Sequence, residues 1–185
     1  KKEHWETVFT SKAENEVSWY QTEPKTSIQL IQACKVAKDA KIIDIGGGDS
    51  YLIDSLLDLG YMNLFLLDIS EAAIERAKKR LGDNAKNVTF IVSDSLYFHS
   101  DEKFEVWHDR ASFHFFTEAI DIEQYKNNVI ANTNQNANFI IGTFSEDGPL
   151  KCSGLPITQY SVEKMEAVFG DDFELENCFT EDHET

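Results

Sequence analysis

The sequence predicts an α/β fold built as a three-layer, doubly wound and mostly parallel sheet. Strand-like apolar runs alternate with helix-like periodic segments along most of the 185 residues, which is the pattern of a parallel sheet with helices on both faces. Acidic residues follow several of these apolar runs, and no repeat or low-complexity linker interrupts them. The length suits one domain, residues 1–185, with a sizeable core.

The first part of the chain, residues 1–40, predicts an N-terminal helical segment. Pro24 suits the first turn of a helix that carries Ile28 and Ile31. Residues 41–45 predict the first strand, because a short apolar run there stops at three glycines. A helix-like pattern follows and ends near Gly60, a natural helix end.

The next units repeat this order. Residues 64–67 are apolar throughout and predict a central strand. Ser70 then caps a helix that stops at Gly82. Residues 88–92 predict the third strand and residues 104–107 the fourth.

The remaining elements complete the predicted order. Residues 118–130 predict a helix and residues 139–143 the fifth strand, so 41–143 form the core of the sheet. The asparagines between them predict a turn, because asparagine tolerates the left-handed conformation: Asn132, Asn134, Asn136 and Asn138. Residues 144–185 hold a loop, a helix capped by Ser161 and a last strand marked by Phe173, Leu175 and Cys178.

Composition excludes several classes of protein. The net charge of −16 disfavours nucleic acid, which needs a basic surface. No apolar run approaches the roughly 20 residues of a membrane span, so no membrane segment is expected. The cysteines are three in number and lack a Cys-x-x-Cys pair: Cys34, Cys152 and Cys178. They indicate free thiols in a reducing, cytoplasmic compartment and no metal site.

The glycine turn carries the main functional signal. Gly46, Gly47 and Gly48 let a ligand approach the backbone without a Cβ in the way, and the helix that follows offers free N–H groups. Asp44 precedes the glycines and Asp49 follows them. Two carboxylates there repel a pyrophosphate and favour a cationic ligand. S-adenosylmethionine, a nucleoside with an ammonium and a sulfonium, fits that field.

Acidic residues also end the next two strands. Asp68 can accept two ribose hydroxyls, and Asp94 can accept the adenine amino group while Leu96 packs on the ring. A single aspartate at a strand end is more often a helix cap or a turn residue. Three at successive strand ends, beside a glycine turn, favour ligand binding.

These motifs resemble a known family. The Asp-x-Gly-x-Gly at 44–48, Asp68, Asp94 and the segment 104–110 resemble the class I, seven-stranded S-adenosylmethionine-dependent methyltransferases from about residue 15 to 179. Segments 17–21, 107–111 and 152–156 resemble a bacterial-type branch of undefined substrate. The resemblance implies a Rossmann-like fold.

Two departures from the family pattern concern the sheet. Asn134-Gln135-Asn136 replaces the usual Pro-Gly-Gly turn before the fifth strand. No segment matches the family's seventh strand, so we expect it to be lacking in this chain and to follow residue 185 in the natural protein.

The resemblance implies a cofactor site of eleven residues: Trp19, Asp44, Gly46, Gly47, Gly48, Asp68, Ile69, Asp94, Ser95, Leu96 and His108. In it, Asp44 holds the ammonium of the methionine moiety, Asp68 binds the ribose and Ile69 lies against the adenine. Asp94 and Ser95 read the base. His108 lies at the mouth, near the sulfonium and the acceptor.

Methyl transfer needs little acid–base chemistry, because the leaving group is neutral. A nitrogen or oxygen acceptor still loses a proton, and His108 and His114 are the candidate catalytic histidines. Asp109 would orient one of them, and Arg110 would bind an acidic substrate. His114 could equally be a packing residue, and Arg110 could simply pair with an acid.

The N-terminal aromatics and the loop 144–160 complete the expectations. Trp5, Trp19 and Tyr20 fit a lid over the cofactor as well as a place in the core. Tyr160 would contact the acceptor, unless the loop is plain turn structure. The acceptor is then a small molecule or a protein side chain, and the oligomeric state is undetermined.

Two other functions stay open. An NAD-dependent oxidoreductase expects a small residue where Tyr51 stands, three positions after the second glycine of its fingerprint. A non-catalytic nucleoside-binding interaction domain would use the same turn.

Overall fold

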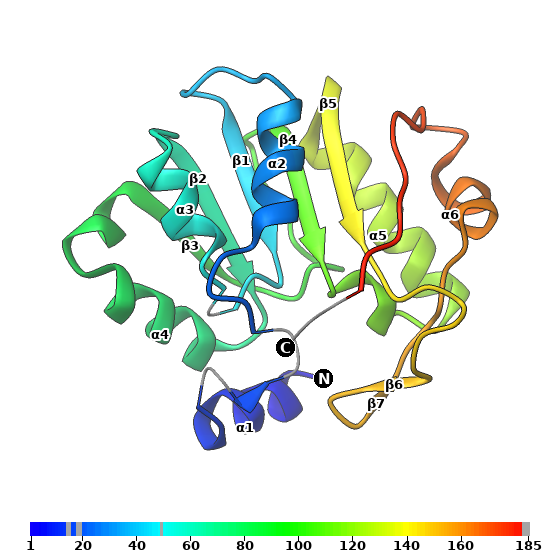
Figure 1. Ribbon diagram of the computed structural model, residues 1–185, viewed down its shortest axis with the longest axis horizontal. Helices are drawn as coiled ribbons and strands as arrows, with labels where there is room; N and C mark the ends of the chain where they lie inside the picture. Colours follow the sequence, from blue (N-terminus) through cyan, green and yellow to red (C-terminus); the bar gives the residue numbers. More distant parts are fainter. Residues whose placement is uncertain (14–15, 18–19, 49, 183–185) are drawn as a thin grey trace.

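A computed structural model describes residues 1–13, 16–17, 20–48 and 50–182 (Figure 1). Its main sheet has five parallel strands in the order β3–β2–β1–β4–β5. They are β1 (Lys41–Ile45), β2 (Asn63–Asp68), β3 (Val88–Val92), β4 (Phe104–Arg110) and β5 (Thr133–Gly142). The order reverses between β1 and β4, so the predicted doubly wound α/β fold is confirmed.

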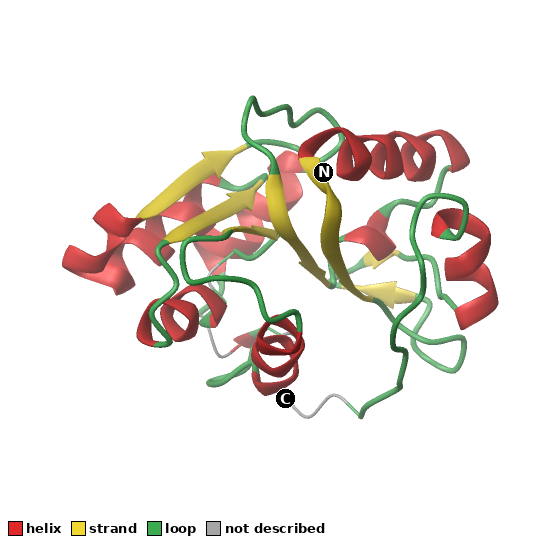
Figure 2. Cartoon of the chain, turned by 90° about the horizontal axis from the view of Figure 1, so that it is seen from above, coloured by secondary structure: helices red, strands yellow, loops and turns green. Residues whose placement is uncertain are grey.

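Helices cover both faces of the sheet (Figure 2). On one face, α2 (Lys25–Ala33), α3 (Leu52–Asp58) and α4 (Glu71–Leu81) pack over Ile42 and Val106. On the other, α5 (Ala119–Asn132) and α6 (Val162–Phe169) pack over Ile43, Ile45 and Trp107. Because side chains alternate along a strand, Asp44 shares the first face with Ile42.

The predicted helix boundaries are confirmed where a cap was identified. The Ser70 hydroxyl accepts a hydrogen bond from the Ala73 N–H at 3.2 Å, and that of Ser161 accepts one from Lys164 N–H at 3.3 Å. Gly82 ends α4 with a positive φ of 54°, a conformation that favours glycine. In the N-terminal segment, α1 (Lys2–Ser11) packs against α4.

The predicted asparagine turn is wrong. α5 includes Asn132, and β5 begins directly at Thr133. The register shifts so that Thr133 pairs with Phe104 but Asn138 with Val106, which places an irregularity where the asparagines lie. Asn134 and Asn136 are exposed on this edge strand, so their polar side chains can stay hydrated.

The predicted last strand is also wrong. Residues 171–182 form no strand, and in Figure 1 this red C-terminal segment passes beside β5. Phe173 packs on Phe139 of β5, with ring centroids 5.3 Å apart. In a strand, Phe173 and Leu175 would point to the same face and both would be buried. Leu175 is instead half exposed. Among the described residues, the main sheet has no antiparallel seventh strand.

The loop 144–160 contains a short hairpin that the sequence analysis did not predict. It pairs β6 (Lys151–Cys152) with β7 (Leu155–Pro156) in antiparallel fashion. Ser153 and Gly154 turn the chain with φ of 49° and 80°, which suits a tight two-residue hairpin. Within the described residues, no helix is long and apolar enough to cross a membrane.

Candidate functional site

The carboxyl ends of the parallel strands open into one large cavity of about 1640 Å³. Many of the predicted site residues line it: Gly46, Asp68, Ile69, Asp94, Ser95, His108, Arg110, His114 and Tyr160. A smaller cavity of about 450 Å³ shares Ile69 and Asp94 with it and adds Leu96. The structure therefore gathers, at one edge of the sheet, residues that lie far apart in the sequence.

The glycine turn has no room for side chains. A Cβ on Gly46 would lie 2.7 Å from the Ser112 Cβ, and one on Gly47 would overlap the Asp44 carboxylate. Gly46 and Gly48 have positive φ values of 63° and 52°, which only glycine adopts readily. Neighbouring side chains therefore pack where a Cβ would stand, and of the three glycines Gly46 lines the large cavity. Asp49 lies outside the described residues.

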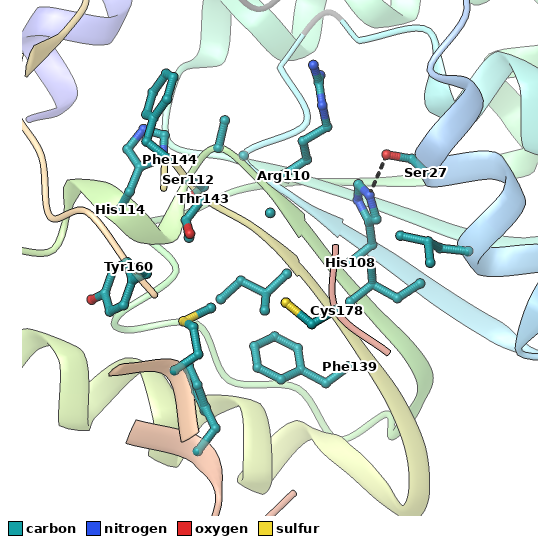
Figure 3. Close-up of a pocket in the computed structure, with 18 of the residues that line it drawn as sticks. Ser27, His108, Arg110, Ser112, His114, Phe139, Thr143, Phe144, Tyr160 and Cys178 are labelled. Atoms are coloured by element: carbon teal, nitrogen blue, oxygen red, sulfur yellow. Dashed lines mark hydrogen bonds between the residues drawn. The ribbon is translucent and has the colours of Figure 1, made fainter. Parts of the chain in front are cut away.

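Asp44 belongs to a buried chain of three polar side chains. Its Oδ1 lies 2.7 Å from Nδ1 of His108. Nε2 of His108 lies 2.9 Å from the Ser27 hydroxyl, the contact drawn as a dashed line in Figure 3. Because a carboxylate only accepts, Nδ1–H of His108 donates to Asp44, and Nε2 is left to hydrogen-bond with the Ser27 hydroxyl. The second oxygen of Asp44, Oδ2, is buried and has no hydrogen-bond partner among the residues that the structure describes. An unsatisfied buried carboxylate oxygen is costly, and it suits a cationic ligand.

His108 lies in the wall of the cavity and not at its mouth. It is 2 % exposed, and both of its ring nitrogens are hydrogen-bonded. β4 extends to Arg110 and places His108 on the sheet face that α2 covers, and its expected place near the sulfonium and the acceptor stays a prediction. This arrangement lets His108 orient Asp44.

Asp68 and Asp94 each use one carboxylate oxygen for the local turn. Asp68 Oδ1 accepts from the Ser70 N–H at 2.8 Å, and Asp94 Oδ1 accepts from the Leu96 N–H at 3.0 Å. The carboxylate of Asp68 also faces the glycine turn, since a Cβ on Gly48 would lie 3.4 Å from its Oδ2. Turn structure and cavity lining thus coexist in both residues.

Asp109 orients neither histidine, contrary to the prediction. Successive residues of a strand point to opposite faces, so Asp109 turns toward α5 while His108 turns toward α2. Its carboxylate accepts from the Tyr125 hydroxyl at 2.5 Å and from the backbone N–H groups of Ser112 and Phe113 at 2.9 and 3.1 Å. Complete burial raises the pKa of Asp109 to about 6, although these hydrogen bonds oppose the rise.

His114 is fully buried, and within the described part of the chain neither of its ring nitrogens has a hydrogen-bond partner. It lies in the turn Phe113–Phe115 after β4 and packs on Phe115 and Phe144, with ring centroids 4.4 and 5.1 Å away. Burial lowers the pKa of His114 to about 4, so its ring is uncharged at neutral pH. The side chain is packed as a core residue and still offers unused polar atoms to the cavity.

Tyr160 and Arg110 lie on the same cavity. Tyr160 is buried, and its hydroxyl makes no hydrogen bond of good geometry with the described residues, although Thr158 is near. Burial raises the pKa of Tyr160 to about 12. Burial also lowers the pKa of the Arg110 guanidinium, and the nearby carboxylates of Asp44 and Glu181 oppose that shift. Arg110 thus lies near two acids of this chain, and its binding of an acidic substrate stays a prediction.

The sequence analysis missed three residues that shape the site. Ser27 shares a buried helix face with Ile31, and a serine on an apolar face was the available signal. Glu6 of α1 accepts hydrogen bonds from the Glu71 and Ala72 N–H groups at 2.6 and 3.2 Å. Phe9 of α1 reaches the glycine turn, 2.9 Å from the place of a Gly48 Cβ.

The N-terminal aromatics are described only in part. Trp5 packs on Phe115, with ring centroids 5.1 Å apart, and Tyr20 on Tyr51 at 6.3 Å. Trp19 lies outside the described residues, so its predicted contact with the cofactor stays a prediction.

The cavity is strongly acidic. Beyond the strand ends, the loop after β5, α6 and the C-terminal segment contribute carboxylates that we call the acidic wall: Glu146, Asp147, Glu163, Glu166, Asp172, Glu174, Glu176, Glu181 and Asp182. The cationic side chains that line the cavity are Lys1, Arg110 and Lys151. Lys164 pairs with Glu146 at 2.7 Å and Lys126 with Asp172 at 3.8 Å. The rest of the wall still carries a large negative charge.

Comparison with known proteins identifies similarity to methyltransferases. A family model described as a methyltransferase domain matches residues 37–181. The eEF1A lysine and N-terminal methyltransferase of Mus musculus is 29% identical over 116 residues, 60% of this chain. Its human counterpart is 27% identical over 111 residues. The chain spans only 16% of the length of these relatives.

Solved structures share the fold at low sequence identity. A structure solved for the conversion of a disulfide bond into a thioacetal group during echinomycin biosynthesis has a TM-score of 0.75 at 18% identity, covering 96% of this chain and 81% of that one. The YcgJ protein of Bacillus subtilis has a TM-score of 0.67 at 15% identity, covering 81% and 68%. The glycopeptide N-methyltransferase MtfA, complexed with S-adenosylhomocysteine, has a TM-score of 0.60 at 17% identity, covering 68% and 54%.

Proposed function

The chain belongs to the methyltransferase-domain family, and from that premise we propose that it is an S-adenosylmethionine-dependent methyltransferase acting on a small molecule or a protein side chain. The observation that carries the proposal is the unpartnered Oδ2 of Asp44, buried beside a turn that has no room for side chains. A diphosphate would be repelled there, whereas an ammonium would satisfy the oxygen.

The residues at the strand ends fit the rest of the cofactor. The bare backbone of Gly46–Gly48 would lie against the methionine moiety, and Asp68 would accept ribose hydroxyls. Ile69, Leu96 and the polar pair Asp94 and Ser95 would enclose the adenine, because all four surround the two cavities at the ends of β2 and β3. Acidic residues would thus face the polar groups of the cofactor, and apolar residues would face its adenine ring.

When bound, the cofactor supplies an electrophilic methyl group on a sulfonium, which leaves as a neutral thioether. The chain's own residues would do the positioning. Ser27 and His108 hold the Asp44 carboxylate in one orientation through bonds of 2.9 and 2.7 Å. His108 is then a positioning residue, because both ring nitrogens are already engaged. Exclusion of water by the buried wall would strengthen these interactions.

Relatives support an acceptor that is a protein group. The relatives that match are named as lysine and N-terminal methyltransferases. The alignment with them covers 60% of this chain. We infer that the 144–160 loop and α6 form the acceptor side, with His114 and Tyr160 in contact with the acceptor.

Calorimetry tests the cofactor assignment. We expect S-adenosylmethionine and S-adenosylhomocysteine to bind with micromolar dissociation constants and NAD not to bind. The Asp44→Asn variant should lose about tenfold or more in affinity, because the charge that pairs with the ammonium is gone. Binding of NAD in preference to either methyl-cycle nucleoside would favour the oxidoreductase alternative and overturn the proposal.

A second experiment separates catalysis from simple nucleoside binding. Labelled S-adenosylmethionine is incubated with the protein and with pools of metabolites or denatured lysate protein, and transferred label is counted. Transfer above that of an Asp44→Asn control supports the enzyme. Tight cofactor binding without any transfer would instead support a non-catalytic interaction domain.

A further inference from the structure

Two buried polar side chains in the cavity have no partner among the described residues. Both nitrogens of His114 and the hydroxyl of Tyr160 lack hydrogen bonds, while His114 is fully buried and Tyr160 is 6 % exposed. Figure 3 shows both among the side chains that line the cavity. Such groups are rare in native structures, because burial without a partner costs stability. They indicate a polar ligand group that is held there.

The two segments that carry these side chains are joined by backbone hydrogen bonds. The Thr158 N–H donates to the His114 carbonyl at 2.8 Å, and the Tyr160 N–H donates to the Phe144 carbonyl at 2.9 Å. Phe144 in turn packs on the His114 ring. The unpaired polar atoms therefore belong to one connected part of the wall, with aromatic rings beside them.

The charge around this part of the wall favours one class of ligand. Asp147 lies three residues after Phe144, and Glu163 lies three residues after Tyr160. Both belong to the acidic wall, and neither is in an ion pair among the described residues. A cation would be attracted by these carboxylates and by aromatic faces, whereas a carboxylate or phosphate would be repelled.

We propose that this part of the cavity binds a primary alkylamine as the methyl acceptor. The amine arrives as its ammonium, attracted by the acidic wall, and His114 and Tyr160 accept its N–H donors. One proton then passes to water, the nitrogen lone pair attacks the methyl carbon, and the carbon–sulfur bond of the cofactor breaks to leave a neutral thioether. The inference rests on the proposed function and narrows it to an amine substrate. A lysine side chain of a protein and a free alkylamine share this chemistry. One ring nitrogen of the neutral imidazole and the phenolic oxygen can each accept a hydrogen bond, so both unpaired groups gain a partner.

The low pKa of His114 agrees with this arrangement. Since burial keeps the ring uncharged at neutral pH, it does not repel a cation as a protonated histidine would. Arg110 is held near Asp44 and Glu181, which moderates its repulsion of the ligand.

The test measures binding to the protein saturated with S-adenosylhomocysteine. The probes are Nα-acetyl-lysine N-methylamide, n-butylamine, the uncharged Nα-acetyl-norleucine N-methylamide and the anionic Nα-acetyl-glutamate N-methylamide. Binding is followed by calorimetry and by the imidazole NMR signals of His114, assigned from their absence in His114→Phe. We expect the capped lysine to bind at least about fivefold more tightly than the norleucine probe and to shift the His114 signals. The glutamate probe should not bind.

Variants test the residues named. Asp147→Asn/Glu163→Gln should weaken capped-lysine binding about fivefold or more, because two carboxylates that line the cavity are neutralised. Asp58→Asn/Asp83→Asn changes the net charge equally but lies outside the cavity, and it should bind the probe as the parent protein does. This pair of surface variants keeps the test valid if His114→Phe does not fold.

The outcomes distinguish the sources and the hypotheses. Capped lysine binding more tightly than n-butylamine supports a protein side chain, and equal binding supports a free amine. Binding of the norleucine or glutamate probe as tight as that of the lysine probe would overturn the inference, as would lysine binding that both double variants leave unchanged. S-adenosylhomocysteine binding is measured first. A protein that fails to bind it would contradict the proposed function, whereas a protein that binds it but not the lysine probe would contradict the amine inference alone.

Discussion

Burial moves the pKa values of His114 and Asp109 in opposite directions. His114 has its pKa lowered to about 4, so the unfolded state binds more protons than the folded state below about pH 6.5. Stability from this residue is present above that pH and is lost as the pH falls toward 4. Asp109 has its pKa raised to about 6, so its contribution is largest at low pH and is lost as the pH rises from about 4 to 6. The two effects oppose each other in the same range.

Replacing His114 should reveal this opposition. In His114→Phe, the Asp109 effect remains alone, so the free energy of unfolding should fall relative to the parent protein as the pH rises from 4.5 to 6. The difference in unfolding free energy between the variant and the parent protein should change by about 1.4 kcal/mol per pH unit and level off above about pH 7. Urea unfolding at each pH measures it. The exposed His99, changed to Gln, serves as the control, and a flat difference for His114→Phe would contradict the burial argument.

Asp68 should bind the cofactor through its charge. Asp68→Ala is expected to weaken S-adenosylhomocysteine binding about tenfold or more, as loss of charge-assisted hydrogen bonds predicts. Because Asp68 also accepts from the Ser70 N–H, Ala could disturb α4. Asp68→Asn keeps an acceptor for that turn and removes the charge. Calorimetry that gives parental affinity for both variants would remove Asp68 from the ribose site.

Single residues were predictable where local chemistry determined them. The glycines at 46–48 and the strand-end aspartates are readable because turn geometry and strand position follow from nearby sequence. The Ser27–His108–Asp44 chain was not, because it joins α2, β4 and β1 across 81 residues of sequence between Ser27 and His108. The role expected of Asp109 failed for a geometric reason: neighbours on a strand face opposite ways.

Among the elements, a carboxylate of α1 holds the first turn of α4. Glu6 accepts hydrogen bonds from the first N–H groups of α4 and from the Ser70 hydroxyl at 3.1 Å. Burial alone would raise the pKa of Glu6, but these hydrogen bonds lower it below its usual value. The negative charge also complements the positive end of the α4 dipole.

Removing that charge should loosen the N-terminal segment. In Glu6→Gln, α1 is expected to exchange its amide hydrogens faster than in the parent protein, while amides of β1 and β4 keep their protection. The effect on capping is on the order of 1 kcal/mol. Hydrogen exchange by mass spectrometry measures it, and Glu3→Gln, which stands in the same helix without a bond to α4 among the described contacts, is the matched control. Equal exchange in the two variants would refute the attachment.

Elements with a clear period were predicted within a few residues, and those defined by tertiary contacts were not. The β1, β3, α4 and α6 segments carry caps or apolar runs of their own. The asparagines joined β5 because an exposed edge strand tolerates polar residues. Residues 173–178 looked strand-like, yet only Phe173 reaches the core, through Phe139 and Phe169. Packing, and not local pattern, decided both cases.

At the scale of the whole molecule, self-repulsion acts against compactness. The net charge is −16, and much of it gathers around one cavity. Salt screens such repulsion, with a Debye length of about 10 Å at 0.1 M. Raising NaCl from about 0.05 to 0.5 M should raise the melting temperature by roughly 5 °C, measured by scanning calorimetry. Sucrose of equal osmolarity is the control, and a melting temperature that falls with salt would contradict the expectation.

Phe9 has a consequence for the kinetics of ligand association. Its ring is 5 % exposed and lies against Gly48, on the side where the Asp68 carboxylate also faces the turn. A nucleoside that uses both Gly48 and Asp68 can settle only after this ring withdraws. The observed association rate should then rise with nucleoside concentration to a plateau set by withdrawal of the ring. The measured affinity for the nucleoside is also reduced, because molecules with the ring in place cannot bind it. A Phe9→Ala protein would bind faster, with no such plateau in stopped-flow measurements.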